Sequence, residues 1–246
     1  MCRWLAYCGE PLRPSELILH PQHSLVAQSL DSPLGAETVN GDGFGFGWYP
    51  KDPGASNAPG LFRSIEPAWN DQNLRELTWA IESPLFFSHV RAAAGPPIQQ
   101  TNCHPFRYQN WLFMHNGALA GFGSVKRDLT FAVDPSLYPD ITGTTDSEVL
   151  FHLALTLGLR EDPVAAMAKA IRAVQSAGRE HGVKFPMQGP SPSRTASPCG
   201  PSGTPPSGRR APCSTRPASP RCNRCTRTSN GCASSGSVPT SWSPSR

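Results

Sequence analysis

The last 59 residues of this 246-residue chain lack whole classes of side chain. From Gln188 onward there is no Asp, Glu, Lys, His, Leu, Ile, Phe, Met or Tyr, and the only large apolar residues are Val238 and Trp242. Eleven Pro, fourteen Ser and eight Arg make up 33 of the 59 residues. Such a segment buries too little apolar surface to offset the entropy of ordering it, so we expect residues 188–246 to be disordered. The composition is typical of a GC-rich gene read out of frame. We hypothesise a frameshift near codon 188, which re-sequencing would test.

Long hydrophobic runs and cysteines are scarce in the rest of the chain. The longest near-apolar run, residues 149–159, is about half the length of a membrane-spanning helix, and the first residues do not resemble a secretory leader. Before the tail, cysteine occurs only at Cys2, Cys8 and Cys103, too few for a disulfide framework. We therefore expect no membrane association, a cytoplasmic location, and a working N-terminus from which Met1 has been removed.

Charge is distributed unevenly along the chain. Residues 1–187 hold all 18 acidic residues and 14 of the 22 basic ones, a net charge of −4, whereas the eight arginines of the tail give it +8. The overall charge of +4 therefore describes neither part, and we expect no nucleic-acid binding.

Short apolar runs bounded by turn residues predict strands over four segments, residues 3–7, 43–48, 85–90 and 111–115. In the second segment, glycines alternate with aromatic residues, so the rings share one face and the other face is open to close approach. Thr145 to Glu148 has the pattern of a capping box ahead of one helix, and Asp162–Pro163 begins a second helix. Strands followed by helices, without βαβ alternation, predict an α+β fold.

Cys2 is a candidate nucleophile. Once Met1 is removed, a thiol and a free α-amino group lie on the same residue. An α-amino group has a pKa of about 7.7–8.0, so about a fifth or less of it is neutral at pH 7 and accepts the thiol proton directly or through one water. This is the arrangement of an N-terminal nucleophile, which needs no separate histidine. A cysteine at position 2, taken alone, also occurs by chance.

Six motifs follow one another along the chain: Met1–Arg3, Asn40–Tyr49, His89–Ala93, Asn102–Phe106, His115–Gly117 and Gly143–Glu148. In this order they resemble the class II glutamine amidotransferases, in their small stand-alone form, over residues 1 to about 185. The resemblance implies a four-layer αββα sandwich of the N-terminal nucleophile (Ntn) hydrolase type. It also implies an N-terminal cysteine that attacks the side-chain amide of glutamine, releases ammonia and leaves a glutamyl thioester for water to hydrolyse.

The same resemblance assigns roles to five residues. Cys2 is the nucleophile, and Asn116 and Gly117 supply a side-chain amide and a backbone N–H to the oxyanion. Arg91 pairs with the substrate carboxylate, and Asp146 meets the substrate ammonium. The glycine-rich 41–47 segment forms a wall of the site, since it lacks the Gly-Lys-Ser/Thr ending of a phosphate loop. The substrate implied is glutamine or a γ-glutamyl small molecule, with no cofactor.

Each assignment has a structural alternative. Asn116–Gly117 is also the strongest short signal for a type I′ hairpin turn between two strands. Arg91 fits a structural ion pair equally well. Asp146 fits a helix-terminal acid favoured by the helix dipole.

A metal site is a further alternative. His89, His104 and His115, together with Cys103, match no common zinc spacing. Cys222–Cys225 has CxxC spacing, but no second pair and no histidine accompanies it in the tail. We expect no bound metal.

Two departures from the family pattern affect these expectations. The family commonly has threonine three residues after the arginine, where this chain has Ala94. That change implies weaker glutamine binding or a substrate other than free glutamine. Strands after the helices normally complete the family's sheet, and the residues after Met187 do not supply them. We therefore expect an incomplete domain over residues 1–187, followed by the tail 188–246, and a chain that folds poorly or lacks activity. Soluble expression with a cooperative melt would contradict this.

Three functions compete. The leading hypothesis is an amidohydrolase acting on the side-chain amide of glutamine. The second is a hydrolase of γ-glutamyl conjugates, as in ergothioneine biosynthesis, with the same cysteine and oxyanion donors. The third is a non-catalytic amino-acid-binding protein on the same scaffold, although binding alone needs no nucleophile such as Cys2. The sequence names no ammonia-accepting partner, so we expect ammonia to enter water or pass to another protein.

Overall fold

The computed structural model describes residues 2–30, 39–52, 58–93 and 95–188. Every described residue belongs to the first of the chain's two units, Met1–Ala211. The predictions made for Ala94 and for residues 189–246, including Cys222–Cys225, lie outside the described residues and stay predictions.

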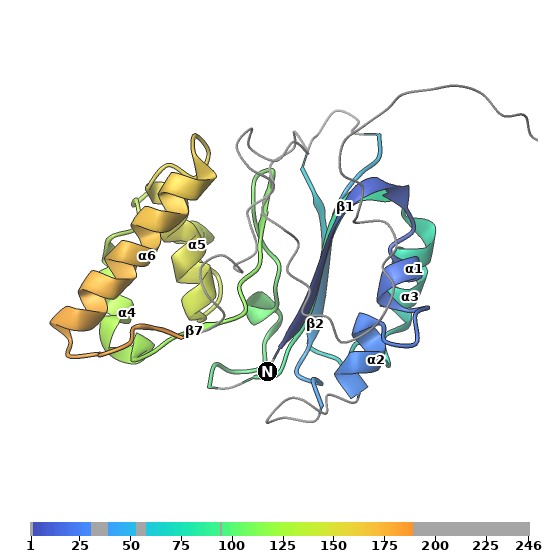
Figure 1. Cartoon of the computed structure of the whole chain (residues 1–246), viewed down its shortest axis with the longest axis horizontal. Helices are drawn as coiled ribbons and strands as arrows, with labels where there is room; N and C mark the ends of the chain where they lie inside the picture. The colour runs from blue at the N-terminus through green and yellow to red at the C-terminus, as the bar shows by residue number, and fades with distance from the viewer. Residues whose placement is uncertain (1, 31–38, 53–57, 94, 189–246) are drawn as a thin grey trace, which may run out of the picture. The chain divides into compact units, whose positions relative to one another are not determined.

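A four-stranded antiparallel sheet forms one layer of the first unit (Figure 1). Its strands, in spatial order, are β1 Arg3–Leu12, β4 Ser83–Val90, β2 Phe44–Tyr49 and β3 Gly60–Ser64. The strands predicted over 3–7, 43–48 and 85–90 are confirmed, and β1 is longer than predicted. The sequence did not predict β3, because its five residues show no alternation of apolar and polar side chains. In the structure all five are half-buried, so neither face of the strand is distinct.

The pairing register of β4 brings distant segments of the chain together. Val90, the last residue of β4, lies opposite Arg3 on β1 and opposite Phe44 on β2. The residue that precedes β1 therefore lies beside the residues that follow β4, and so Cys2 lies beside Arg91.

Three helices cover one face of this sheet (Figure 1): α1 Ser15–Ile18, α2 Leu25–Leu30 and α3 Gln72–Ala80. Ile18, Leu25 and Leu74 from these helices form one core cluster with Phe46 and Phe86 of the sheet. The expectation that helices follow the strands is wrong in this half of the chain.

Their sequences explain why these helices were not predicted. Helices α1 and α2 have four and six residues, too few to show a helical period. Helix α3 buries only Leu74 and Thr78, and it exposes 57% of Trp79. Its one readable signal is the N-cap, where the Asp71 carboxylate accepts the Leu74 N–H at 2.8 Å.

The other face of the sheet packs against one of two short strand pairs. Strand β5 Phe106–Tyr108 pairs with β6 Trp111–Phe113, and β7 Ala118–Leu119 pairs with β8 Met187–Gln188. Leu85 and Phe87 of β4 form a cluster with Leu112 and Met114. Because Phe86 lies in the first cluster, successive residues of β4 contribute to cores on opposite faces of the sheet.

A second group of helices packs on the far side of β5 and β6 (Figure 1): α4 Phe122–Phe131, α5 Asp146–Thr156 and α6 Pro163–Glu180. Two short 3₁₀ turns, Gln100–Asn102 and Tyr138–Asp140, complete the described elements. Helix–sheet, sheet–sheet and sheet–helix clusters thus define four layers, as predicted for an αββα sandwich of the α+β class. No helix in the described part of the chain is both long and apolar enough to span a membrane.

The predicted helix starts are confirmed. Thr145 caps α5 by accepting the Glu148 N–H at 3.2 Å, and Asp162 caps α6 by accepting the Ala165 N–H at 2.9 Å. The reciprocal half of the capping box differs from the prediction. The Glu148 carboxylate accepts the N–H groups of the Thr142–Gly143 segment at 3.0 and 2.7 Å, and so it ties the preceding loop to the helix.

The bare face of β2 is also confirmed. Phe44 and Phe46 lie in the core cluster beneath α1–α3. Gly45 and Gly47, which alternate with them, face the layer that contains β5 and β6. A Cβ on Gly45 would overlap the carbonyl of His104, and one on Gly47 would come within 2.9 Å of Leu112. Glycine therefore allows the two strand layers to approach closely.

The expectation that the residues after Met187 do not complete the second sheet stays a prediction. Strand β8, which follows the helices, ends with Gln188, the last described residue. The expected poor folding is likewise a prediction that a melting curve would test.

We predict that Gly45→Ala lowers the free energy of unfolding by about 1–3 kcal/mol, because the new methyl group forces the two layers apart. Denaturant titration of purified protein measures this. Gly123→Ala in α4 is the matched control, since its Cβ would meet no atom within 4 Å. It should leave stability unchanged or raise it by up to about 1 kcal/mol. Equal midpoints for the two variants would contradict the close approach at Gly45.

Candidate active site

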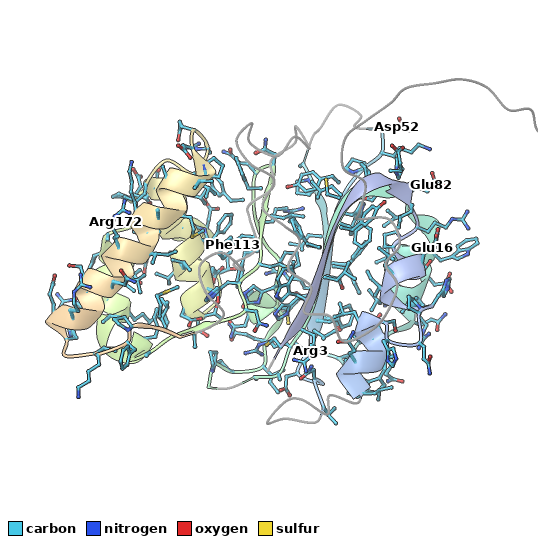
Figure 2. The ribbon with its side chains drawn as sticks, in the orientation of Figure 1. Arg3, Glu16, Asp52, Glu82, Phe113 and Arg172 are labelled. Carbon is cyan, nitrogen blue, oxygen red and sulfur yellow. The ribbon has the colours of Figure 1, made fainter. Side chains whose placement is uncertain are left out.

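One cavity of about 490 Å³ is lined by all five predicted site residues, Cys2, Arg91, Asn116, Gly117 and Asp146. They come from four places: the start of β1, the end of β4, the β6–β7 connection and the first turn of α5. Figure 2 labels two of their neighbours, Arg3 after Cys2 and Phe113 at the end of β6. A larger hollow of about 760 Å³ lies along α4, and none of the five residues lines it.

Cys2 contacts the segment after β4 through backbone groups. Its thiol donates to the Ala92 carbonyl at 3.5 Å, and its sulfur accepts the Ala92 N–H at 3.4 Å. The Asn116 side chain donates to the Cys2 carbonyl at 3.2 Å. The candidate nucleophile is thus half-buried, with a fixed N–H donor at its sulfur.

Arg91 is buried, and the two terminal nitrogens of its guanidinium group differ in their contacts. It is 5% exposed, and its Nη2 donates to the Pro96 carbonyl at 3.0 Å. Its Nη1 is buried and has no hydrogen-bond partner in the described part of the chain. The ion pairs found among the described residues, Lys51–Glu82 and His181–Asp128, do not include Arg91. Among the described residues, no ion pair supports the structural alternative for Arg91.

Asn116 and Gly117 do not form a hairpin turn. Strand β6 before them pairs with β5, and strand β7 after them pairs with β8. Neither residue has the positive φ that a type I′ turn requires at both central positions. The hairpin alternative is wrong, and both residues lie at the edge of the cavity beside Cys2.

Asp146 is the first residue of α5, and backbone donors fix its carboxylate. Its Oδ2 accepts the Leu119 N–H at 2.7 Å, and its Oδ1 accepts the Ser147 N–H at 2.7 Å. A helix N-terminus favours a negative charge, so the helix-terminal alternative also fits this geometry. Asp146 nevertheless lines the cavity, which the alternative alone does not require.

Several residues that build the site were not predicted. Ala92 contributes only backbone groups, which no residue type signals. The Asn102 side chain accepts the Thr144 N–H at 2.8 Å and donates to the Pro97 carbonyl at 2.9 Å, joining two loops at the cavity. The Asp42 carboxylate accepts the Ala93 N–H at 2.7 Å. Asp42 and Asn102 both lie within the six motifs, and their place there was the only sequence signal for a role in the site.

Two buried histidines form part of the cavity wall. The rings of His89 and His104 lie 4.5 Å apart, and no ring nitrogen of either has a partner among the described residues. Burial, with the charge of nearby Arg91, lowers the pKa of His89 to about 3 and that of His104 well below 6.5. Both rings are therefore neutral at pH 7. No group of three or more metal-ligating side chains occurs in the described part of the chain.

The four-layer fold, with a cysteine beside the Ala92 N–H just ahead of the first strand, is that of the Ntn-hydrolase class. Residues 21–184, more than half of the chain, match the family described as class-II glutamine amidotransferases. The chain belongs to this family of enzymes. The matched range begins after Cys2.

Individual relatives agree with this. The chain is 44% identical over 160 residues to the probable glutamine amidotransferase DUG3 of Saccharomyces cerevisiae, covering 63% of this chain and 45% of that protein. It is 31% identical over 166 residues to the gamma-glutamyl-hercynylcysteine sulfoxide hydrolase of Mycolicibacterium smegmatis, covering 65% of this chain and 64% of the relative. The chain thus spans less than two thirds of either curated relative.

A solved structure has a similar fold. It is a glutamine aminotransferase class-II domain protein from Silicibacter pomeroyi, with a TM-score of 0.54 and 33% identity. The match covers 78% of this chain and 68% of that one.

The neutral histidines predict acid sensitivity. Histidine titrates near pH 6.5 in an unfolded chain, whereas His89 stays unprotonated in the folded chain down to about pH 3. Below pH 6.5 the unfolded state therefore binds the proton that the folded state does not. Stability should fall as the pH drops from 6.5 towards 3, by up to about 1.4 kcal/mol per pH unit for each such histidine.

Denaturant midpoints at pH 7, 6 and 5 measure this slope. His89→Gln should have a shallower slope than the wild type, and His23→Gln, at an exposed position, should match the wild type. Identical slopes for all three proteins would show that His89 is not buried in its neutral form.

Proposed function

We propose that this chain is an amidohydrolase of the glutamine amidotransferase type, with Cys2 as its N-terminal nucleophile. The observation that carries the proposal is the contact of the Cys2 sulfur with the Ala92 N–H inside a cavity that Asn116 and Gly117 also line. Removal of Met1 gives Cys2 a free α-amino group. Since the chemistry requires a free thiol, the reducing cytoplasm is the compartment we propose.

In the first half of the reaction, the α-amino group takes the thiol proton and the sulfur attacks the side-chain carbonyl carbon of the substrate. The C–N bond then breaks, the proton passes to the leaving nitrogen, and ammonia departs. A γ-glutamyl thioester remains on Cys2. In the second half, water attacks the thioester, the C–S bond breaks, and glutamate leaves with the thiol restored.

Asn116 and Gly117 would stabilise the negative charge of both tetrahedral intermediates. One N–H of the Asn116 amide donates to the Cys2 carbonyl, so the other N–H is left for the oxyanion. The Gly117 N–H is the second donor in this proposal. Donors that are already oriented need no reorganisation as the charge develops.

Arg91 and Asp146 would hold the amino-acid end of the substrate. Nη1 of Arg91, which has no hydrogen-bond partner within the described ranges, suits a carboxylate, and a buried cation of this kind gains most from such a partner. Asp146 Oδ2 accepts a single hydrogen bond, from Leu119, so it has a lone pair for an ammonium group.

A γ-glutamyl conjugate is the second candidate substrate. The relative from Mycolicibacterium smegmatis is named for hydrolysis of such a compound. The same atoms would attack the same carbonyl, and an amine larger than ammonia would leave. The ammonia-accepting partner, if the substrate is glutamine, is not identified by any feature of the cavity.

Two assays distinguish the candidates. Ammonia release from L-glutamine and p-nitroaniline release from γ-L-glutamyl-p-nitroanilide report the first and the second function. Cys2→Ala should abolish both, whereas Cys8→Ala, at an exposed position of β1, should abolish neither. Release that survives Cys2→Ala would contradict the mechanism. Binding of glutamine without turnover in the wild type would favour the amino-acid-binding alternative.

Asn116→Ala should lower kcat by about 10²–10³-fold with little change in KM, because the lost donor acts mainly in the transition state. Asn73→Ala, at an exposed position of α3, is the matched control and should leave both constants unchanged. A variant that raises only KM would assign Asn116 to ground-state binding instead.

A further inference from the structure

A row of three hydrogen-bonded side chains leads from the β6–β7 connection to the N-terminus of α5. His115 Nδ1 lies 2.9 Å from Ser147 Oγ, and Ser147 Oγ lies 3.2 Å from Asp146 Oδ1. His115 and Ser147 are 4% and 3% exposed, and all three residues line the cavity. His115, which precedes the proposed oxyanion donor Asn116, is therefore linked by hydrogen bonds to Asp146, the candidate ammonium site.

The direction of each hydrogen bond in this row is determined. Ser147 Oγ donates to Asp146 Oδ1, and a hydroxyl has only one proton to donate. The Ser147 oxygen then accepts from His115 Nδ1–H. Burial lowers the pKa of His115, so the ring is neutral and its Nε2 has no proton.

This row restricts the Asp146 carboxylate to one orientation. Oδ1 accepts two hydrogen bonds from Ser147, one from its N–H and one from its hydroxyl, and Oδ2 accepts one from the Leu119 N–H. A carboxylate has about four acceptor positions, so a single position on Oδ2 is left for a ligand. Without the Ser147 hydroxyl, Asp146 Oδ1 loses the hydrogen bond that links it to His115.

We propose that His115 and Ser147 are positioning residues that aim Asp146 Oδ2 at the α-ammonium group of the bound substrate. The inference rests on the proposed function for the identity of the ligand. This arrangement would favour ligands with a free α-amino group. His115 would then act in binding through Nδ1 and not in proton transfer through Nε2.

Calorimetric titration of the full chain with L-glutamate and with glutarate tests this, because glutarate is glutamate without the α-amino group. Wild type should bind glutamate more tightly than glutarate. Ser147→Ala should weaken glutamate binding about tenfold, the usual effect of losing a hydrogen bond to a charged group, and leave glutarate binding unchanged. Equal weakening of both ligands would indicate general damage to the cavity and overturn the inference.

Two substitutions of His115 separate its ring nitrogens. An asparagine amide reaches about as far as Nδ1, so His115→Asn should keep glutamate binding within about threefold of wild type. A glutamine amide replaces Nε2 instead, so His115→Gln should weaken glutamate binding about tenfold. The reverse order would overturn the positioning role through Nδ1.

Ser136→Ala is the matched control, because Ser136 makes the same kind of bond to Asp134, at 2.6 Å, on the exposed surface. It should change neither affinity, and melting curves of all variants verify folding. No glutamate binding by a folded wild-type chain would overturn the inference. Glutamate binding that follows the predicted pattern, without turnover of glutamine or γ-glutamyl-p-nitroanilide, would leave the inference standing and contradict only the proposed function.

Discussion

The pairing of β1 with β4 determines where the chemistry of this chain is located. Arg3 lies opposite Val90, so the residue before β1 contacts the residues after β4. The Cys2 sulfur consequently receives the Ala92 N–H, and the Arg91 guanidinium opens into the same cavity. A shift of one residue would turn these side chains to the opposite face of the sheet. The glycines of β2 contribute by letting the second strand layer, which leads to Asn116, approach closely.

Around this pairing, one cavity is lined by neutral histidines together with an arginine and an aspartate. Neutral His89 and His104 line the same cavity as the buried Arg91, whose Nη1 has no hydrogen-bond partner among the described residues. Asp146 provides the opposite charge at the N-terminus of α5, and the Glu148 contacts to the preceding loop hold that terminus in place. In the function we propose, the carboxylate and the ammonium of an amino acid such as glutamine pair with Arg91 and Asp146.

The sequence predicted the parts of this arrangement that depend on side-chain type and local pattern. Alternation of glycine with aromatic residues revealed β2, and a short apolar run bounded by turn residues revealed β4. The caps at Thr145 and Asp162 revealed α5 and α6, because each of these signals lies within a few residues. Motif order singled out five residues that line one cavity in the structure. Backbone donors such as the Ala92 N–H were not predictable, since every residue has one and only the register selects it. The link from His115 to Asp146 was missed for a similar reason, because it joins side chains about thirty residues apart that only the packing of α5 brings together.

The intact mass of the purified chain, before and after incubation with the glutamine-like electrophile diazo-oxo-norleucine, tests the central claim most directly. The account predicts a chain without Met1 that gains a single adduct, located on Cys2 and absent from Cys2→Ala. Such a result would establish the N-terminal nucleophile and a glutamine-shaped cavity together. A chain that retains Met1, or an adduct that persists in Cys2→Ala, would contradict the account.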